Sequence, residues 1–366
     1  MTQPKQIKQL ALIAILLPIL ISLMVWLVSG SSNQAQLLQW QDGWQTTTPF
    51  KYARRAPAAA AYEGYLYLSG GVDAQGNYID AVEYAAILDN GQLGPWQSTS
   101  SLIEGRFYHS LVAYQGYLYA IGGGSGLLGQ ANYPLASVEK AKIQPDGSLG
   151  EWQTEKPLTL PRRGLKVVQY QNTLYAIGGY SGIFLRSVER TQISDEGQLD
   201  TWQAEEQLSI IDRYIHSSAI HNKVIYLLGG HMQSRDSASY GDIEISHIRP
   251  DGRLRPWQIE PQSLIESRLV AEAFVLGNFL YIAGGHSGNE RLNSVEHARI
   301  GADGHIGPWR QSSRLATPRS AAAVATFGKY VYLLGGGGGG QPLNSVDMAS
   351  QHRSGRLGVP IVPAQN

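Results

Sequence analysis

Cysteine is absent from this chain of 366 residues, and the chain has no excess charge of either sign. Without cysteine, disulfides, thiolate metal sites and cysteine nucleophiles are all excluded. Lysine and arginine number 29, aspartate and glutamate also 29, and charged residues make up only 16% of the sequence. This balance argues against general electrostatic attraction to nucleic acid or anionic lipid, so we expect no nucleic-acid partner. Glycine and tyrosine are abundant instead, with 42 and 20 residues, which is typical of a protein with many strands and tight turns.

A long apolar run occurs near the start of the chain. The nineteen residues Leu10 to Val28 carry no charge and follow Lys5 and Lys8. As a helix they would span roughly 28 Å, about the thickness of a bilayer core. We therefore predict a cytoplasmic segment (1–9), a transmembrane anchor or uncleaved signal sequence (10–28) and a polar linker (29–39).

A cleaved signal peptide is the alternative, because "VSGSS" supplies small residues after the apolar run. The run is longer than the roughly 7–15 apolar residues of a typical cleaved signal, which favours the anchor. In both cases the lysines keep the N-terminus in the cytoplasm. We thus expect a protein of the cytoplasmic (inner) membrane whose remaining residues lie on the periplasmic or extracytoplasmic side.

The rest of the chain contains six copies of one repeat. Each copy has an apolar run that ends in a glycine pair, as in "GYLYLSGG" and "KYVYLLGG", and the pairs recur every 51 to 56 residues. The pairs begin at Gly70, Gly122, Gly178, Gly229, Gly284 and Gly335. Sixteen positions before each pair is an arginine: Arg54, Arg106, Arg162, Arg213, Arg268 and Arg319. Each arginine follows a tryptophan by ten or eleven residues, namely Trp44, Trp96, Trp152, Trp202, Trp257 and Trp309. After each pair comes an acid in a β-type run: Glu83, Glu139, Glu189, Glu244, Glu296 and Asp347.

Each unit is predicted to form four strands, a to d. Strand a follows the arginine, strand b ends at the glycine pair, strand c carries the acid and strand d carries the tryptophan. Units of this kind cannot bury both faces alone, so six of them are expected to stack into a closed propeller. The sixth unit ends in "SGRLGVPIV", where Pro360 stands in place of the tryptophan. We therefore expect the strand around Trp44 to complete the last blade and to close the ring.

These columns resemble the Kelch repeat family, in which a glycine doublet ends strand b and a tryptophan lies in strand d. The resemblance covers residues 44 to about 358. It implies an all-β fold, a six-bladed Kelch-type β-propeller over residues 40–366, here with one N-terminal transmembrane helix. It further suggests a bacterial, exported, membrane-anchored member of the family. The chain departs from the family pattern two positions after each acid, where the family's tyrosine is replaced, for example by Ala85.

The start of strand a and the end of strand b lie at the same rim, which also gathers the d–a and b–c loops. Candidate ligand-binding residues are therefore the six arginines, together with three residues that follow glycine pairs: Tyr180, His231 and His286. Arginine is suited to a carboxylate, a phosphate or an acidic peptide. The alternative is structural, with each arginine neutralised by the acid of strand c. Lys166 and Glu272 are the only charges at their column of strand a, and they could reach the channel or pair with neighbouring blades.

We expect a non-catalytic protein- or glycan-binding or scaffold module that acts through this rim, with no cofactor and no metal. An acidic ligand is compatible with the arginines, and Leu10–Val28 could contact other membrane proteins. Two alternatives remain. One is a sugar-acid mutarotase or epimerase, which the chain resembles in part, with ring arginines holding the carboxylate and Glu104 or Glu266 as the base. The other is a structural subunit of a cell-envelope complex.

Overall fold

The structure is a computed structural model that describes residues 39–126, 132–231 and 240–361. The chain divides into two compact units, Asp42–Val359 and a smaller one made from the residues before and after it. The predicted anchor (10–28) and the residues before it lie outside the described part, as does all but the last residue of the predicted linker. Where the chain is described, no helix is long and apolar enough to cross a membrane.

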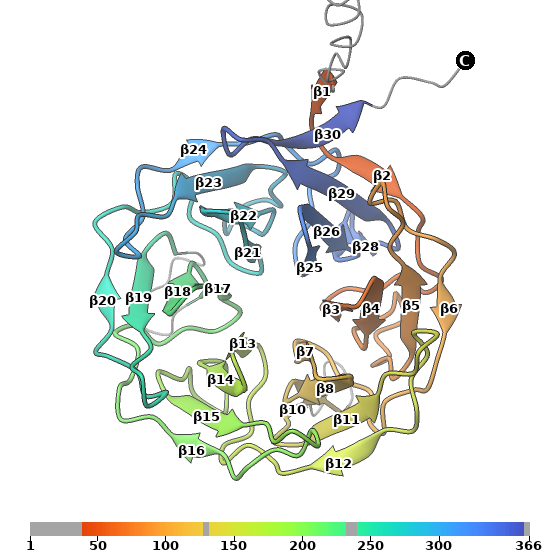
Figure 1. Ribbon diagram of the computed structural model, residues 1–366, viewed down its shortest axis with the longest axis vertical. Coiled ribbons are helices and arrows are strands. Elements are labelled where there is room, and N and C mark those ends of the chain that lie inside the picture. The colour runs from red at the N-terminus through yellow and green to blue at the C-terminus, as the bar shows by residue number, and fades with distance from the viewer. Residues whose placement is uncertain (1–38, 127–131, 232–239, 362–366) are drawn as a thin grey trace, which may run out of the picture. The chain divides into compact units, whose positions relative to one another are not determined.

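The unit Asp42–Val359 is a propeller of six blades (Figure 1). Blade 1 contains β3 (Ala58–Tyr62), β4 (Tyr65–Ser69), β5 (Val82–Ala86) and β6 (Gln97–Ser98). Blade 2 contains β7 (Ser110–Tyr114), β8 (Tyr117–Ile121), β11 (Val138–Lys142) and β12 (Gln153–Glu155). Blade 3 contains β13 (Lys166–Tyr170), β14 (Thr173–Ile177), β15 (Val188–Gln192) and β16 (Gln203–Ala204). Blade 4 contains β17 (Ser217–His221), β18 (Val224–Leu228), β19 (Ile243–His247) and β20 (Gln258–Ile259). Blade 5 contains β21 (Glu272–Leu276), β22 (Phe279–Ala283), β23 (Val295–Arg299) and β24 (Arg310–Gln311). Blade 6 contains β25 (Ala323–Phe327), β26 (Tyr330–Leu334), β29 (Val346–Gln351) and β2 (Gln45–Thr47), and β30 (Leu357–Ile361) also pairs with β29.

Three further elements complete the strands. Strand β1 (Gln39–Asp42) begins the described chain. Two short hairpins stand in b–c loops, formed by β9 (Gly124–Ser125) with β10 (Tyr133–Pro134) and by β27 (Gly337–Gly338) with β28 (Gln341–Pro342).

The innermost strand of each blade contacts the innermost strands of both neighbours, which closes the ring (Figure 1). Blade 6 combines the two ends of the repeat array, since β2 is antiparallel to β29 with Thr46 opposite Asp347. The side chains of these two residues are also hydrogen-bonded, from Thr46 Oγ1 to Asp347 Oδ1 at 3.2 Å. Pairing of chain ends within one blade removes the open edges that the first and last blades would otherwise expose.

A tyrosine three positions before each glycine pair joins the blades: Tyr67, Tyr119, Tyr175, Tyr226, Tyr281 and Tyr332. Each of these tyrosines donates its hydroxyl hydrogen to a glycine carbonyl in the c–d turn of the next blade. For example, Tyr281 Oη lies 2.8 Å from the Gly355 oxygen and Tyr332 Oη lies 2.7 Å from the Gly91 oxygen. Four tryptophans likewise donate Nε1–H to a backbone carbonyl of the adjacent blade: Trp44, Trp96, Trp152 and Trp202. A buried phenol needs a partner for its hydroxyl, and a turn carbonyl at fixed distance supplies one.

Register places two kinds of connection at opposite rims. Ala58 of β3 pairs with Ser69 of β4, and Ser69 pairs with Val82 of β5, so strand a begins where strand b ends and strand c begins. We call this end of the ring, with its d–a loops before the arginines and its b–c loops after the glycine pairs, the loop rim. The other end, with the a–b and c–d turns, is the hairpin rim.

Candidate binding surface at the loop rim

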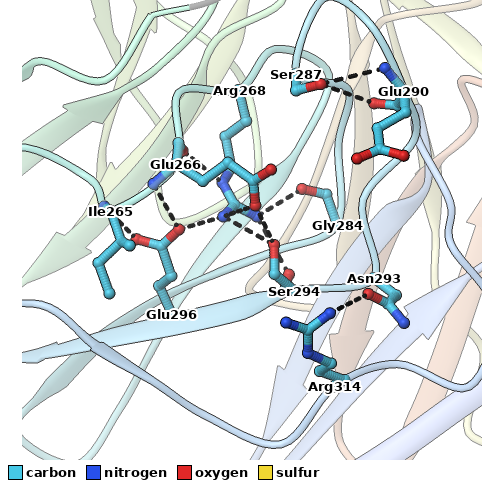
Figure 2. A network of polar contacts seen from close by, with 10 residues as sticks. All are labelled: Ile265, Glu266, Arg268, Gly284, Ser287, Glu290, Asn293, Ser294, Glu296 and Arg314. Atoms are coloured by element: carbon cyan, nitrogen blue, oxygen red, sulfur yellow. Dashed lines mark hydrogen bonds and ion pairs between the residues drawn. The ribbon is translucent and has the colours of Figure 1, made fainter.

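Arg268 shows what the repeated arginine does (Figure 2). Its Nη1 donates to the carbonyl oxygens of Gly284 at 2.9 Å and Ser294 at 3.2 Å. Its Nη2 forms an ion pair with Glu296 and a hydrogen bond with Ser294 Oγ at 3.1 Å. Burial lowers the pKa of the Arg268 guanidinium, and the carboxylates of Glu296 and Glu266 oppose that shift. The guanidinium therefore connects strand b and strand c within its own blade.

The same arrangement recurs in all six blades. Every ring arginine is at most 2% exposed and forms an ion pair with the acid of strand c in its own blade. Every one also donates from Nη1 to the carbonyl of the first glycine of the pair. The six arginines predicted to bind a ligand therefore lie buried within the blades, and their guanidinium groups already pair with carboxylates: Arg54, Arg106, Arg162, Arg213, Arg268 and Arg319. We call each such set of arginine, acid and glycine carbonyl a clamp.

The glycine pair brings the next blade close to the clamp. The second glycine donates its N–H to the arginine carbonyl of the next blade, as Gly230 does to Arg268 at 2.9 Å. The first glycine has positive φ, and a Cβ at Gly229 would lie 2.3 Å from the Arg268 carbonyl oxygen. Only glycine combines this backbone conformation with so close an approach. Arginine and glycine pair therefore repeat together because they connect strands within blades and backbones between blades.

The acid of each clamp also holds the d–a loop in blades 1 to 5. Glu139 accepts the N–H of Ile103 at 2.7 Å, and Glu296 accepts that of Ile265 at 2.8 Å. The remaining acceptors of loop N–H groups are Glu83, Glu189 and Glu244. A carboxylate that accepts backbone N–H groups fixes the loop backbone at a defined height above the blade.

These fixed loops present apolar side chains to solvent. Five of them carry a large apolar residue that is between 41% and 58% exposed: Tyr52, Ile103, Leu160, Ile210 and Ile265. Leu208, also in a d–a loop, and Ile183 and Tyr133, in b–c loops, are exposed as well. Of the ten large apolar residues that are exposed in the described chain, only Leu88 and Ile259 lie away from the loop rim. We call these eight residues the apolar tips.

A second set of residues surrounds the channel mouth. The residue after each ring arginine forms a β-bridge with the residue after the glycine pair, as Arg163 does with Tyr180 and Tyr214 with His231. The Arg163 guanidinium lies 4.6 Å from the centre of the Tyr180 ring, in a cation–π contact. Phe184 packs 5.3 Å from Tyr214 and 5.2 Å from His231, measured between ring centres. The mouth over blades 3 and 4 is consequently aromatic.

The three candidates after the glycine pairs lie at this mouth. Tyr180 and His231 are brought together through Phe184, which contacts both rings. His286 belongs to blade 5, where it bridges Leu269 and its Nδ1 accepts the Gly288 N–H at 3.0 Å. Across the described residues, no group of three or more His, Cys, Asp or Glu is arranged to hold a metal ion.

The channel narrows below the mouth. Two positions after each arginine, one residue per blade has positive φ: Ala56, Tyr108, Gly164, Ile215, Val270 and Ala321. Each of these residues donates its N–H to the carbonyl of its counterpart in the preceding blade, at distances from 2.7 to 3.3 Å. The six hydrogen bonds form a closed circle. Left-handed backbone costs most for β-branched residues such as Ile215 and Val270, so this circle is a strained collar held by the surrounding blades.

A charge pair lies inside the channel next to the collar. Lys166 Nζ is 2.8 Å from both carboxylate oxygens of Glu272. The two residues belong to blades 3 and 5, so they pair across the channel with each other and not with adjacent blades. Burial raises the pKa of Glu272, and Lys166 opposes this shift. Together with His109, His216 and residues of the other blades, they line a cavity of about 170 Å³ and a narrower one beside it.

Glu104 and Glu266, the two carboxylates predicted as a catalytic base, form contacts other than the Lys166–Glu272 pair. Glu104 accepts a hydrogen bond from the Tyr133 hydroxyl at 3.0 Å. Glu266 accepts one from Ser294 Oγ at 2.8 Å and lies 3.7 Å from Arg268 Nη2 (Figure 2). Glu266 is thus attached to a clamp whose guanidinium already holds Glu296.

Sequence reasoning missed the apolar tips and the residues after the arginines. One signal was present, because an isoleucine or leucine precedes the arginine by two or three positions in blades 2 to 5. A second signal was the residue after the arginine, which changes from blade to blade while the arginine does not.

Comparisons with known proteins agree with this architecture. Residues 161–190 and 318–348 match the model of the Kelch motif family. The chain is 28% identical to beta-scruin of Limulus polyphemus over 274 residues, which are 72% of this chain and 28% of beta-scruin. Alpha-scruin of the same organism is 26% identical over 256 residues, which are 68% of this chain and 27% of alpha-scruin. The chain therefore spans about a quarter of the length of these relatives. The solved structure of YjhT has a TM-score of 0.68 at 12% identity, with 87% of this chain and 99% of YjhT covered, and it is similar in fold alone.

Proposed function

We propose that this chain, which belongs to the Kelch-repeat β-propeller family, is a protein-interaction module that binds a partner through the apolar tips of its loop rim. The observation that carries the proposal is that eight of the ten large apolar residues exposed in the described part of the chain gather at one rim. Exposed apolar residues on a rigid scaffold are characteristic of protein-binding surfaces. The aromatic mouth with Arg163 adds residue types that dominate binding energy at interfaces.

The clamps support a binding role for the rim. The acids of blades 2 to 5 hold the very loops that carry Ile103, Leu160, Ile210 and Ile265. Loops fixed by buried charge-assisted hydrogen bonds lose little conformational entropy when a partner binds. The ring arginines therefore serve binding indirectly, by holding the apolar tips in place.

The mutarotase alternative requires free arginines beside an isolated carboxylate. Each ring arginine instead pairs with the acid of strand c, at 2.8 Å in both Arg162–Glu189 and Arg319–Asp347. On this basis we expect the protein to leave the anomer exchange of sialic and uronic acids unaccelerated, as followed by NMR.

The test uses a photoreactive amino acid introduced into the full-length protein in its native membranes. Positions Ile103 and Ile265 sample the apolar tips, and Ile259, which is 49% exposed on an outer strand, is the matched control. We expect one and the same protein adduct from both tips and none from Ile259. Equal adducts from all three positions, or none from the tips, would contradict the proposal.

A glycan is the second ligand class, because aromatic rings such as Tyr180 and Tyr214 also stack on sugars. Screening the same protein on a glycan array distinguishes this case. Saturable glycan binding that is lost in Tyr214→Ala but retained in Ile265→Ser would assign the mouth to a glycan and leave the apolar tips for protein.

The membrane attachment of this module is proposed from its sequence. We propose that residues 10–28 anchor the chain in the cytoplasmic membrane and that the propeller faces the periplasm. The charge-free run after two lysines supports this placement. Resistance of the protein to extraction by alkaline carbonate, and cleavage by protease added to the outer side, are the expected results. Release by carbonate would contradict the anchor.

A further inference from the structure

A pocket of about 590 Å³ opens on the hairpin rim between blades 5 and 6, far from the surface assigned to partner binding. Its volume is in the range of small-molecule sites. Three arginines line it: Arg299 of β23, Arg310 of β24 and Arg353 of the c–d turn of blade 6. Phe279 and His297 form an aromatic wall, with their ring centres 5.8 Å apart. We call this site the junction pocket.

The cations of the junction pocket are not neutralised by their surroundings. None of the three arginine side chains has a hydrogen bond or ion pair with any described residue, and no described aspartate or glutamate lines the pocket. Two acids next to the pocket already accept hydrogen bonds from its lining residues His305 and Ile306. Glu260 accepts from His305 Nδ1 at 2.7 Å and from the Ile306 N–H at 3.0 Å, while Asp303 Oδ1 accepts the His305 N–H at 3.2 Å.

His297 supplies an unsatisfied polar atom in the wall. The residue is only 4% exposed, its ring stacks 5.7 Å from that of Tyr281, and its Nδ1 is buried with no hydrogen-bond partner. Burial and the nearby Arg310 lower the pKa of His297, so its ring is neutral at pH 7. A buried imidazole nitrogen without a partner is costly unless something else binds it.

The other blade junctions show that this chemistry is specific to one place. Where Arg310 stands, directly after the strand d tryptophan, the other five blades have glutamine: Gln45, Gln97, Gln153, Gln203 and Gln258. Where Ser354 stands, before the glycine of the c–d turn, the other blades have Asn90, Asp146, Glu196, Asp251 and Asp303. The blade 5–6 junction therefore has serine where four of the other five junctions have an acid, and arginine where the other five blades have glutamine.

Two cations at other junctions, each directly after the acid of strand c, are paired. Lys140 lies 2.7 Å from Glu155, and Arg190 pairs with Glu205, each glutamate standing three residues after a strand d tryptophan. In blade 5 that position is Ser312, whose Oγ accepts the Leu357 N–H at 3.2 Å. Blades 2 and 3 thus neutralise these cations with that glutamate, and blade 5 has serine in its place.

We propose that the junction pocket binds an organic phosphate, that is, a phosphate ester whose body is a planar or apolar ring. The three guanidinium groups hold the phosphate oxygens, because arginine donates two parallel hydrogen bonds to such oxygens. Phe279 packs against the ring of the ester. His297 Nδ1 lies in the same wall and gains a partner from the ligand.

The test measures binding of phenyl phosphate to the full-length protein in a neutral detergent at physiological salt, by calorimetry. We expect saturable binding by the wild type. Arg310→Gln, which inserts the residue that the other five blades carry, is expected to weaken it at least about tenfold, the factor for loss of one charge-assisted contact. Ser354→Asp, which restores the acid of the other junctions, is expected to weaken it similarly.

Arg253→Gln is the matched control, because the Arg253 side chain is 53% exposed in the c–d turn of blade 4 and lies 3.7 Å from Glu206. It removes the same charge from the same rim and is expected to leave binding unchanged. Glycerol phosphate, the headgroup of a phospholipid, is a second probe. Binding of glycerol phosphate alone, sensitive to Arg310→Gln, would contradict the ring-bearing ester and assign the phosphate to a lipid headgroup. Binding of phenyl phosphate supports the ring-bearing ester. No saturable binding of either probe, or binding unchanged in both variants while they remain folded, overturns the proposal.

Discussion

Replacing Glu139 by glutamine tests what a clamp contributes. The Glu139 side chain is 2% exposed and accepts from three donors: Arg106 Nη2, the Ile103 N–H at 2.7 Å and the Glu104 N–H at 3.3 Å. Glutamine keeps the shape but places an NH₂ group among donors and removes the carboxylate that forms the ion pair with Arg106. The remaining acceptors for Arg106 among the described residues are neutral, namely the Glu104, Gly122 and Ser137 carbonyls and Ser137 Oγ.

Breaking a buried ion pair by removing one partner costs about 3–5 kcal/mol, because the other charge stays buried without compensation. We expect Glu139→Gln to lower the free energy of unfolding by this amount. Glu206→Gln is the control. Glu206 is 78% exposed and lies 3.7 Å from Arg253, and exposed pairs of this kind contribute only about 0–1 kcal/mol.

The assay is urea unfolding followed by tryptophan fluorescence, together with hydrogen exchange of the Ile103 amide. In an Arg106→Met background the buried charge is gone, so Glu139→Gln is expected to cost less than in the wild type by about 1–3 kcal/mol. A cost below about 1 kcal/mol, or the same cost with methionine at position 106, would refute the clamp as a buried charge pair.

Two further predictions concern the pH dependence of stability and the replacement of glycines that have positive φ. Burial lowers the pKa of His216 from 6.5 to about 3, so between these values only the unfolded chain binds the proton, and stability falls as pH falls. From pH 7 to 5 the loss attributable to His216 is about 2 kcal/mol, and His216→Gln is expected to reduce the measured pH dependence of urea unfolding by that amount. A variant with the wild-type pH dependence would contradict this. For Gly339, with φ +55° and no atom within 4 Å, alanine is expected to cost about 1–2 kcal/mol. At Gly229 the new Cβ would meet the Arg268 carbonyl, so Gly229→Ala is expected to lower the stability measured by thermal unfolding by about 1–3 kcal/mol more than Gly339→Ala does. Equal losses for the two variants would contradict the claim that the Arg268 carbonyl leaves no room for a Cβ at Gly229.

The architecture was readable from the sequence because each blade must satisfy the same physical demands. The tyrosine of strand b repeats since every blade needs a hydroxyl at its neighbour's turn, as with Tyr67 and the Gly147 carbonyl at 2.9 Å. The glycine pair repeats since every blade needs positive φ beside the next blade's arginine. A six-bladed all-β propeller follows from counting these columns, and the structure confirms it.

The contacts that differ between blades could not be read in this way. The repeat column of strand a singles out Lys166 and Glu272 as its only charges, but it does not show that they pair with each other, 106 positions apart in blades that are not neighbours. The apolar tips depend on loop conformation, which is set by hydrogen bonds to acids some thirty residues away, such as Ile265 to Glu296. The junction pocket lies where two columns depart from their usual residues in the same place, at Arg310 and Ser354.

Arginine footprinting tests the central claim, that the ring arginines hold the scaffold and leave binding to the side chains around them. The folded full-length protein is treated with phenylglyoxal, and the rate of modification at each arginine is read by mass spectrometry. Arg54, Arg106, Arg162, Arg213, Arg268 and Arg319, at most 2% exposed, are expected to react only at the rate of global unfolding, while Arg253 and Arg310 react freely. Modification of the ring arginines at the rate of these exposed arginines would show that their guanidinium groups are open to ligands and would contradict the claim.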